Sequence, residues 1–128
     1  MISLSDYFMG RDHTYAAELN NELVNNATVT VDRANALLKL FGTNRGVTSG
    51  WRPKTLNDAT PGAAKKSNHI KCLAVDLEDK DGKLAKWCVE NVERLVEIGL
   101  WMESPMHTKG WVHVQTIAPR SGNRIFIP

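Results

Sequence analysis

The sequence predicts an α+β domain, with a small antiparallel sheet and helices packed on one side of it. Apolar residues at helical spacing occupy much of the first half of the chain, and short alternating segments gather after residue 100. Helices followed by strands that pair through hairpins are typical of this class. A chain of 128 residues is large enough for one core, and no repeat or linker divides it. We therefore expect a single domain over residues 1–128.

Two helices are expected before residue 43. The first covers "DHTYAAELNNELVNN" (12–26), with Asp12 as its cap. The second begins at Thr30 in "TVDRANALLKLFG", where Thr30 is the expected cap and Gly42 the stop. Both helices carry an apolar stripe that would face the sheet.

The middle of the chain is expected to alternate strands with one long loop. "GVTSGW" (46–51) is typical of a short strand, and residues 53–66 are typical of an irregular loop. Loops of this length in a compact domain often carry function. "LAVDL" (73–77) predicts the next strand. A third helix follows over "KLAKWCVENVERLVEI" and ends at Gly99. Three further strands are expected in "LWME", "GWVHVQTI" and "NRIFIP".

Composition and charge exclude several classes. Hydrophobic residues make up 42% and charged residues 23% of the chain, as in a soluble globular protein. A net charge of +2 without a basic stripe argues against a nucleic-acid partner. No run approaches a membrane span of about 20 apolar residues, so we expect no membrane insertion. With two cysteines and no secretory signal, we expect synthesis in the cytoplasm, free thiols and a monomer.

Two histidines and an aspartate form the candidate site. In "KKSNHIKCLAVDL" a straight strand would point His69 and Asp76 to opposite faces, so they meet only if the chain bends. In "GWVHVQ" the side chains of Trp111, His113 and Gln115 share one face, and the valines between them suit a core. Two imidazoles and one carboxylate leave a coordination position open for water, as in catalytic zinc sites.

The same segment resembles a known family. Ser67-x-His69-x-x-Cys72-x-Ala74-x-Asp76 is similar to the Ser-x-His-x-x-Gly-x-Ala-x-Asp signature of peptidase family M15, the zinc D-alanyl-D-alanine carboxypeptidases and phage endolysins. These enzymes are related in fold to the hedgehog signalling domain. "SGWRP" resembles the family's Ser-Gly-aromatic-Arg segment, and "WVHV" its final-ligand strand. The resemblance runs from about residue 46 to 116 and implies a hedgehog/DD-peptidase-like zinc fold.

The resemblance assigns roles to individual residues. It implies that His69, Asp76 and His113 bind Zn²⁺ and that Arg52 holds a carboxylate or carbonyl of the peptide. A guanidinium suits this task because its fork of donors matches a carboxylate. Ser67 is expected to support the ligands or touch the substrate. Two residues near the last ligand are expected to line the substrate site, Trp111 and Gln115.

Two departures from the family pattern bear on the site. Cys72 replaces the glycine that most easily takes a positive φ, so either the bend uses ordinary dihedrals or the site is altered. His69 and Cys72 are also a possible ligand pair of a cysteine-containing structural site. Many relatives place an acid three positions before the last histidine, where this chain has Gly110. We expect Glu103, in "GLWMESP", to be the catalytic base, with His107 in reserve; a surface position for Glu103 stays open.

These features predict a zinc metallopeptidase that cleaves peptidoglycan stem peptides, as a D-Ala carboxypeptidase or as an endopeptidase between L-Ala and a D-amino acid. The resemblance to phage-type members implies a phage or prophage lytic enzyme that acts on the cell wall. It would be released by a partner or carried on the phage particle. The alternative is an inactive, zinc-stabilised module that binds peptidoglycan or builds the virion.

Overall fold

A five-stranded sheet in the order β1-β2-β4-β3-β5 forms the centre of the computed structural model, which describes all 128 residues. The strands are β1 (Val47–Ser49), β2 (Ala74–Glu78), β3 (Trp101–Glu103), β4 (Trp111–Gln115) and β5 (Ile125–Phe126). All neighbours pair antiparallel except β3 and β5. The α+β class is confirmed, and the sheet is mixed because the chain loops past β3 after β4 and returns parallel to it.

The N-terminal helices differ from the expected pair. The chain forms α1 (Leu4–Phe8), α2 (Arg11–Thr14), the 3₁₀ turn η1 (Ala16–Glu18) and one long helix, α3 (Asn21–Phe41). Asn20 caps α3 by accepting a hydrogen bond from the Leu23 amide, so the predicted helix over 12–26 is wrong. Thr30 is not a cap but lies buried inside α3, and Gly42 ends the helix with φ 94° as expected.

The later helices are shorter than predicted. The expected third helix is divided at Asn91 into α5 (Lys83–Glu90) and α6 (Val92–Ile98), because the Asn91 backbone leaves the helical region. Gly99 ends α6 at φ 89° as predicted. The expected irregular loop at 53–66 contains α4 (Lys54–Asp58), and a further 3₁₀ turn, η2 (Pro105–His107), follows β3.

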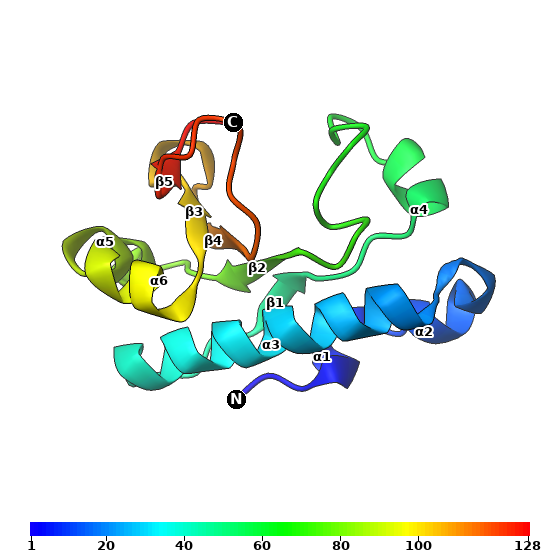
Figure 1. The fold of residues 1–128 in the computed structure, drawn as a ribbon, viewed down its shortest axis with the longest axis horizontal. Helices are drawn as coiled ribbons and strands as arrows, with labels where there is room; N and C mark the ends of the chain where they lie inside the picture. Colours follow the sequence, from blue (N-terminus) through cyan, green and yellow to red (C-terminus); the bar gives the residue numbers. More distant parts are fainter.

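The two faces of the sheet have different surroundings, because one packs in the hydrophobic core and the other does not. Val75 and Leu77 of β2 pair with Val114 and Val112 of β4, and all four are fully buried in the core. Figure 1 shows α3 running along this side of the sheet, while the segment that carries α4 rises away from α3. Alternation along β2 and β4 therefore turns the residues between the valines toward the second face. None of the helices is long and apolar enough to cross a membrane.

Candidate metal centre

Three side chains predicted from the sequence meet on the second face of the sheet. Asp76 and His113 are direct partners in the β2–β4 pairing, and His113 Nδ1 lies 2.9 Å from Asp76 Oδ1. His69 arrives from the turn before β2, and its Nε2 lies 3.3 Å from the same oxygen. One ligand atom from each residue lies within 4.8 Å of the other two. The structure thus brings together the three residues expected to bind a metal.

A residue with a left-handed backbone conformation produces the bend that lets His69 and Asp76 meet. Cys72 has φ 58°, so the chain takes the conformation that a glycine would favour and not ordinary dihedrals. The hydroxyl of Thr30 donates to the Cys72 carbonyl at 2.7 Å and holds the turn against α3. The Ser67 hydroxyl accepts from the His69 amide at 3.2 Å. Ser67 therefore supports the turn that presents His69.

Cys72 does not act as a ligand in this structure. Its side chain belongs to the hydrophobic core, as does that of Cys88, and both thiols are free. Burial raises the pKa of the Cys72 thiol to about 12, which keeps it protonated near neutral pH. The cysteine-containing structural metal site, the alternative left open by the sequence, is therefore not formed.

The backbone of the SGWRP segment orients His69. His69 Nδ1 lies 2.9 Å from the Gly50 carbonyl, which can only accept, so Nδ1 carries a hydrogen and Nε2 is the nitrogen that faces Asp76. Gly50 packs so closely on α1 that an added Cβ would lie 1.8 Å from the Tyr7 carbonyl oxygen. A glycine is required here because of this close approach, and the approach places the carbonyl that orients the ligand.

Opposite charges couple the three residues. Burial alone raises the pKa of Asp76, but hydrogen bonds from His113 and His69 outweigh it and hold the pKa well below its usual range. Burial alone lowers the pKa of His113, but the hydrogen bond and charge of Asp76 and the contact with Gln115 raise it above its ordinary value. The metal-free site therefore favours a carboxylate beside an imidazolium.

Glu103 stands next to this cluster. Met102 pairs with Val114, and the next residue of β3, Glu103, follows on the face that carries His113, where the charges of the two side chains interact. Glu103 is half-buried, and burial raises its pKa, while the charges of His113, His107 and His69 act in the opposite direction. His107 lies in η2 and is exposed, so it stands at the rim. Glu103 is the last residue of β3 and is partly exposed, so its role as the catalytic base stays a prediction.

Arg52 is held without an acidic partner. Its guanidinium donates to Asn57 Oδ1 at 3.1 Å and to Ser49 Oγ at 3.3 Å, and its backbone amide donates to the His69 carbonyl at 3.1 Å. No carboxylate forms an ion pair with it. The charge is fixed in place but not neutralised, as a site for a substrate oxygen requires.

Comparison with known protein families agrees with this arrangement. Residues 10–115 match the family model described as Peptidase M15. The chain belongs to the peptidase M15 family. The matched region contains the metal cluster, Glu103 and Arg52, and the family assignment points to a peptidase. Neither the curated proteins nor the solved structures contain a match to the chain.

The donor set of this M15 domain fits the zinc ion that the family generally uses. Zinc bonds of 2.0–2.1 Å in tetrahedral geometry separate neighbouring donor atoms by roughly 3.3 Å. The measured separations from Asp76 Oδ1, 2.9 Å to His113 and 3.3 Å to His69, are close to this value. Two imidazole nitrogens and one carboxylate oxygen are also ligands that zinc accepts.

Trp111 and Gln115, both expected in the substrate site, differ in exposure and contacts. Trp111 is half-buried on the same face of β4, two residues from His113. Gln115 is only 3% exposed, and its side-chain oxygen lies 2.9 Å from His113 Nε2. That oxygen is engaged within the protein, and Gln115 also lines a hollow beside the site, so its role as a substrate contact stays a prediction. Reasoning from sequence missed this contact, although a spacing of two on one strand face signals it.

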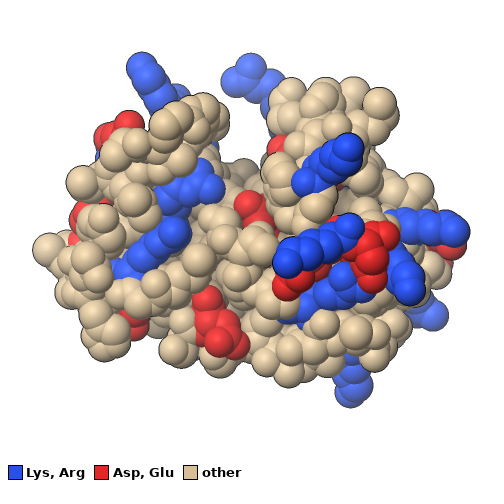
Figure 2. All heavy atoms as spheres, turned by 180° about the vertical axis from the view of Figure 1, so that it is seen from behind, with Lys and Arg blue, Asp and Glu red and all other residues tan.

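Hollows surround the M15 site unevenly. One of about 500 Å³ lies beside it and is lined by Asn68, Gln115 and Phe126 together with the C-terminal segment. The Phe126 ring stands edge-on to His113, with centroids 6.2 Å apart. Figure 2 shows a notch between two lobes of the molecule, with acidic atoms near its base and basic side chains on both lobes. The side chains of His113 and Asp76 are 13% and 14% exposed, so the cluster is not sealed from solvent.

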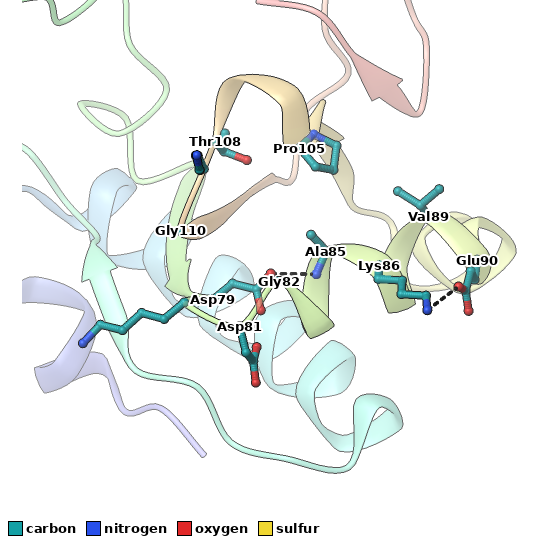
Figure 3. A pocket seen from close by; sticks show the side chains of 12 residues that line it. Asp79, Asp81, Gly82, Ala85, Lys86, Val89, Glu90, Pro105, Thr108 and Gly110 are labelled. Carbon is teal, nitrogen blue, oxygen red and sulfur yellow. Dashed lines mark hydrogen bonds and ion pairs between the residues drawn. The ribbon is translucent and has the colours of Figure 1, made fainter.

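A separate hollow of about 550 Å³ lies between α5 and the turn that precedes β4 (Figure 3). None of the metal-site residues lines it. Several of its charged groups have partners: Lys86 lies 3.9 Å from Glu90, and Asp79 accepts from the Ala85 amide at 2.9 Å. Asp79 therefore caps the start of α5, and we assign this hollow no part in the chemistry.

Proposed function

We propose that this M15 domain is a zinc peptidase that hydrolyses a peptide bond in peptidoglycan stem peptides. The bond would be that of a terminal D-alanine or one between L-Ala and a D-amino acid. The observation that carries the proposal is the placement of Glu103 beside His113, on the face that holds the three-ligand cluster. A cluster that served stability alone would not need a half-buried carboxylate next to it.

Each residue has a chemical task in this proposal. His69, Asp76 and His113 would hold the zinc ion, which when bound polarises a carbonyl and lowers the pKa of water to about 7. Glu103 takes a proton from the attacking water and passes it to the leaving amine. Burial raises the pKa of Glu103, which makes its carboxylate a better proton acceptor.

Arg52 orients the substrate. Its guanidinium is fixed by Asn57 and Ser49, so it loses little freedom when it binds. A free carboxylate or a peptide carbonyl of the stem peptide matches its remaining donors. Trp111, two residues from His113 on the same face, offers an apolar wall to the peptide. Support for a cell-wall substrate comes from the resemblance to carboxypeptidases and endolysins of the family.

The place of action follows from the same resemblance. We propose a monomeric phage or prophage lytic enzyme that is made in the cytoplasm and acts on the cell wall. It would be released by a partner that opens the membrane or carried on the phage particle. Neither a nucleic-acid partner nor insertion into the membrane belongs to this proposal.

Digestion of purified muropeptides, read by mass spectrometry, tests the function. We expect wild type to release D-alanine or to cut after L-alanine, and both a chelator and Glu103→Gln to stop the release. The alternative, an inactive module, predicts sedimentation with peptidoglycan and lower stability with chelator, but no released peptide. Full activity of Glu103→Gln would remove Glu103 from the mechanism.

A further inference from the structure

We propose that Gln115 is a positioning residue that determines which nitrogen of His113 faces the metal centre. The inference rests on the zinc-binding part of the proposed function and not on its substrate. Gln115 lies two residues after His113 on the same face of β4, and its side-chain oxygen lies 2.9 Å from His113 Nε2.

Two contacts define the orientation of the Gln115 amide. Its nitrogen donates to the Ile117 carbonyl at 2.8 Å, and its oxygen accepts from Asn68 Nδ2 at 3.3 Å. The oxygen is therefore the atom that meets His113, and an oxygen can only accept. Consequently His113 Nε2 carries a hydrogen, and the nitrogen left to bind a metal is Nδ1, the one that lies 2.9 Å from Asp76.

Without Gln115, neutral His113 would carry its hydrogen on Nδ1 and not on Nε2. The Asp76 carboxylate also accepts a hydrogen bond, so it attracts a hydrogen to His113 Nδ1. A neutral imidazole with its hydrogen on Nδ1 has no lone pair there for a metal. Gln115 opposes this by holding the hydrogen on Nε2. In wild type the Gln115 side chain is only 3% exposed, so it and not water occupies the position next to His113 Nε2.

Asn68 extends the network to the other histidine. Asn68 precedes His69 in the turn, and its backbone carbonyl accepts from the Leu73 amide at 3.0 Å, so the turn itself holds it. Its side chain links this turn to Gln115 and thus to β4. The ligands from the turn and from the strand are tied together by amides that do not themselves bind metal, an arrangement that usually affects metal affinity by about 10–100-fold.

Zinc affinity of full-length variants, measured by competition with a chelating dye, tests the proposal. We expect Gln115→Met, which keeps the size but removes the acceptor, to weaken zinc binding about 10–100-fold. Gln115→Glu keeps an acceptor oxygen and should stay within about a few-fold of wild type. Asn44→Met, at an exposed amide outside the site, serves as the matched control and should bind like wild type. Unfolding in excess chelator measures any general loss of stability.

Nitrogen-15 NMR of the histidine rings gives the second readout. In zinc-loaded wild type we expect His113 to carry hydrogen on Nε2, and in metal-free Gln115→Met at alkaline pH on Nδ1. Wild-type zinc affinity in Gln115→Met, or His113 bound through Nε2 in wild type, would overturn the proposal. If Gln115→Met does not fold, Gln115→Glu and the wild-type spectrum still decide it. If wild type binds no zinc, the proposed function fails first, so the two failures are distinguishable.

Discussion

His113 and Asp76 face each other across adjacent antiparallel strands, with His113 Nδ1 2.9 Å from Asp76 Oδ1. The relationship is set by strand register, because a shift of one residue would turn either side chain into the core. His69 joins the pair through a turn and not through the sheet. The site therefore assembles when β2 pairs with β4 and the turn at Cys72 closes.

Glu103→Gln tests the catalytic base. The amide keeps the size of the side chain but cannot take a proton, so we expect peptide hydrolysis to fall by about 10²–10⁴-fold. Zinc content and thermal stability should remain those of wild type, because Glu103 is not among the three metal-site residues. Rates on a purified muropeptide, together with metal analysis, check this. Retained hydrolysis would transfer the role elsewhere, with His107→Ala the next variant to examine.

Arg52→Lys tests substrate positioning. Lysine keeps the charge but loses the fork, so we expect kcat/KM to fall by about 10-fold or more, as for the loss of one charged hydrogen bond. Stability should fall by about 1–3 kcal/mol because lysine cannot keep both hydrogen bonds to Asn57 and Ser49, and denaturant unfolding measures this loss separately from activity. Arg94→Lys is the matched control, since Arg94 forms an exposed pair with Glu97 at 2.9 Å and should keep full activity. Equal activity of both variants would contradict a role for Arg52.

The stability of the metal-free protein should depend on pH through His113 and Asp76. A raised pKa of His113 contributes stability below the ordinary imidazole pKa of about 6.5, and this is lost as pH rises through the folded-state value. A lowered pKa of Asp76 contributes stability above about 3.9, and this is lost as pH falls through its folded-state value. With chelator present, we expect the free energy of unfolding to decline as the pH rises above about 6.5.

Zinc affinity should depend on pH in the opposite direction to the stability of the metal-free protein. Binding must displace the proton on His113 Nδ1, so zinc affinity should rise with pH through and above about 6.5. Denaturant unfolding with chelator, and chelator competition at a series of pH values, measure the two effects. His113→Asn in chelator should show a flatter pH dependence than wild type. An unchanged slope in that variant would show that other groups cause the dependence.

Cys72 provides a prediction about backbone strain. Its φ of 58° is left-handed, where a side chain costs about 1–2 kcal/mol relative to glycine. At an ordinary position glycine is less stable than alanine by about 0.5–1 kcal/mol. We therefore expect Cys72→Gly to be as stable as Cys72→Ala or more stable, although it removes more buried atoms. Denaturant unfolding in excess zinc checks the order, and a clearly more stable alanine variant would contradict the strain.

The sequence predicted the cluster of His69, Asp76 and His113 better than it predicted the helices. His69, Asp76 and His113 could be found because a metal site requires particular residue types, and alternation along a strand places them on known faces. Helix boundaries depended on weaker local preferences. Asn20 competed with Asp12 as a cap, and Thr30 is polar but lies inside a helix because its hydroxyl bonds to the Cys72 carbonyl. That contact spans 42 residues and leaves no local signal.

The support around the ligands was also hidden in the sequence. The Gly50 carbonyl orients His69, yet a backbone atom carries no residue-type signature. Asn57 lies in a segment expected to be irregular, and only the structure shows that it is buried and holds Arg52. The parallel pairing of β5 with β3 depends on the path of the loop after β4, which alternation does not specify.

Metal analysis of purified protein is the most direct test of the account. After equilibration with zinc and removal of free ion, we predict one zinc ion per wild-type chain and almost none in Asp76→Ala. Asp58→Ala, at an exposed aspartate paired with Lys54, should retain the wild-type content. A zinc content in Asp76→Ala equal to that of wild type, or wild-type protein without zinc, would contradict the claim that His69, Asp76 and His113 form the metal centre.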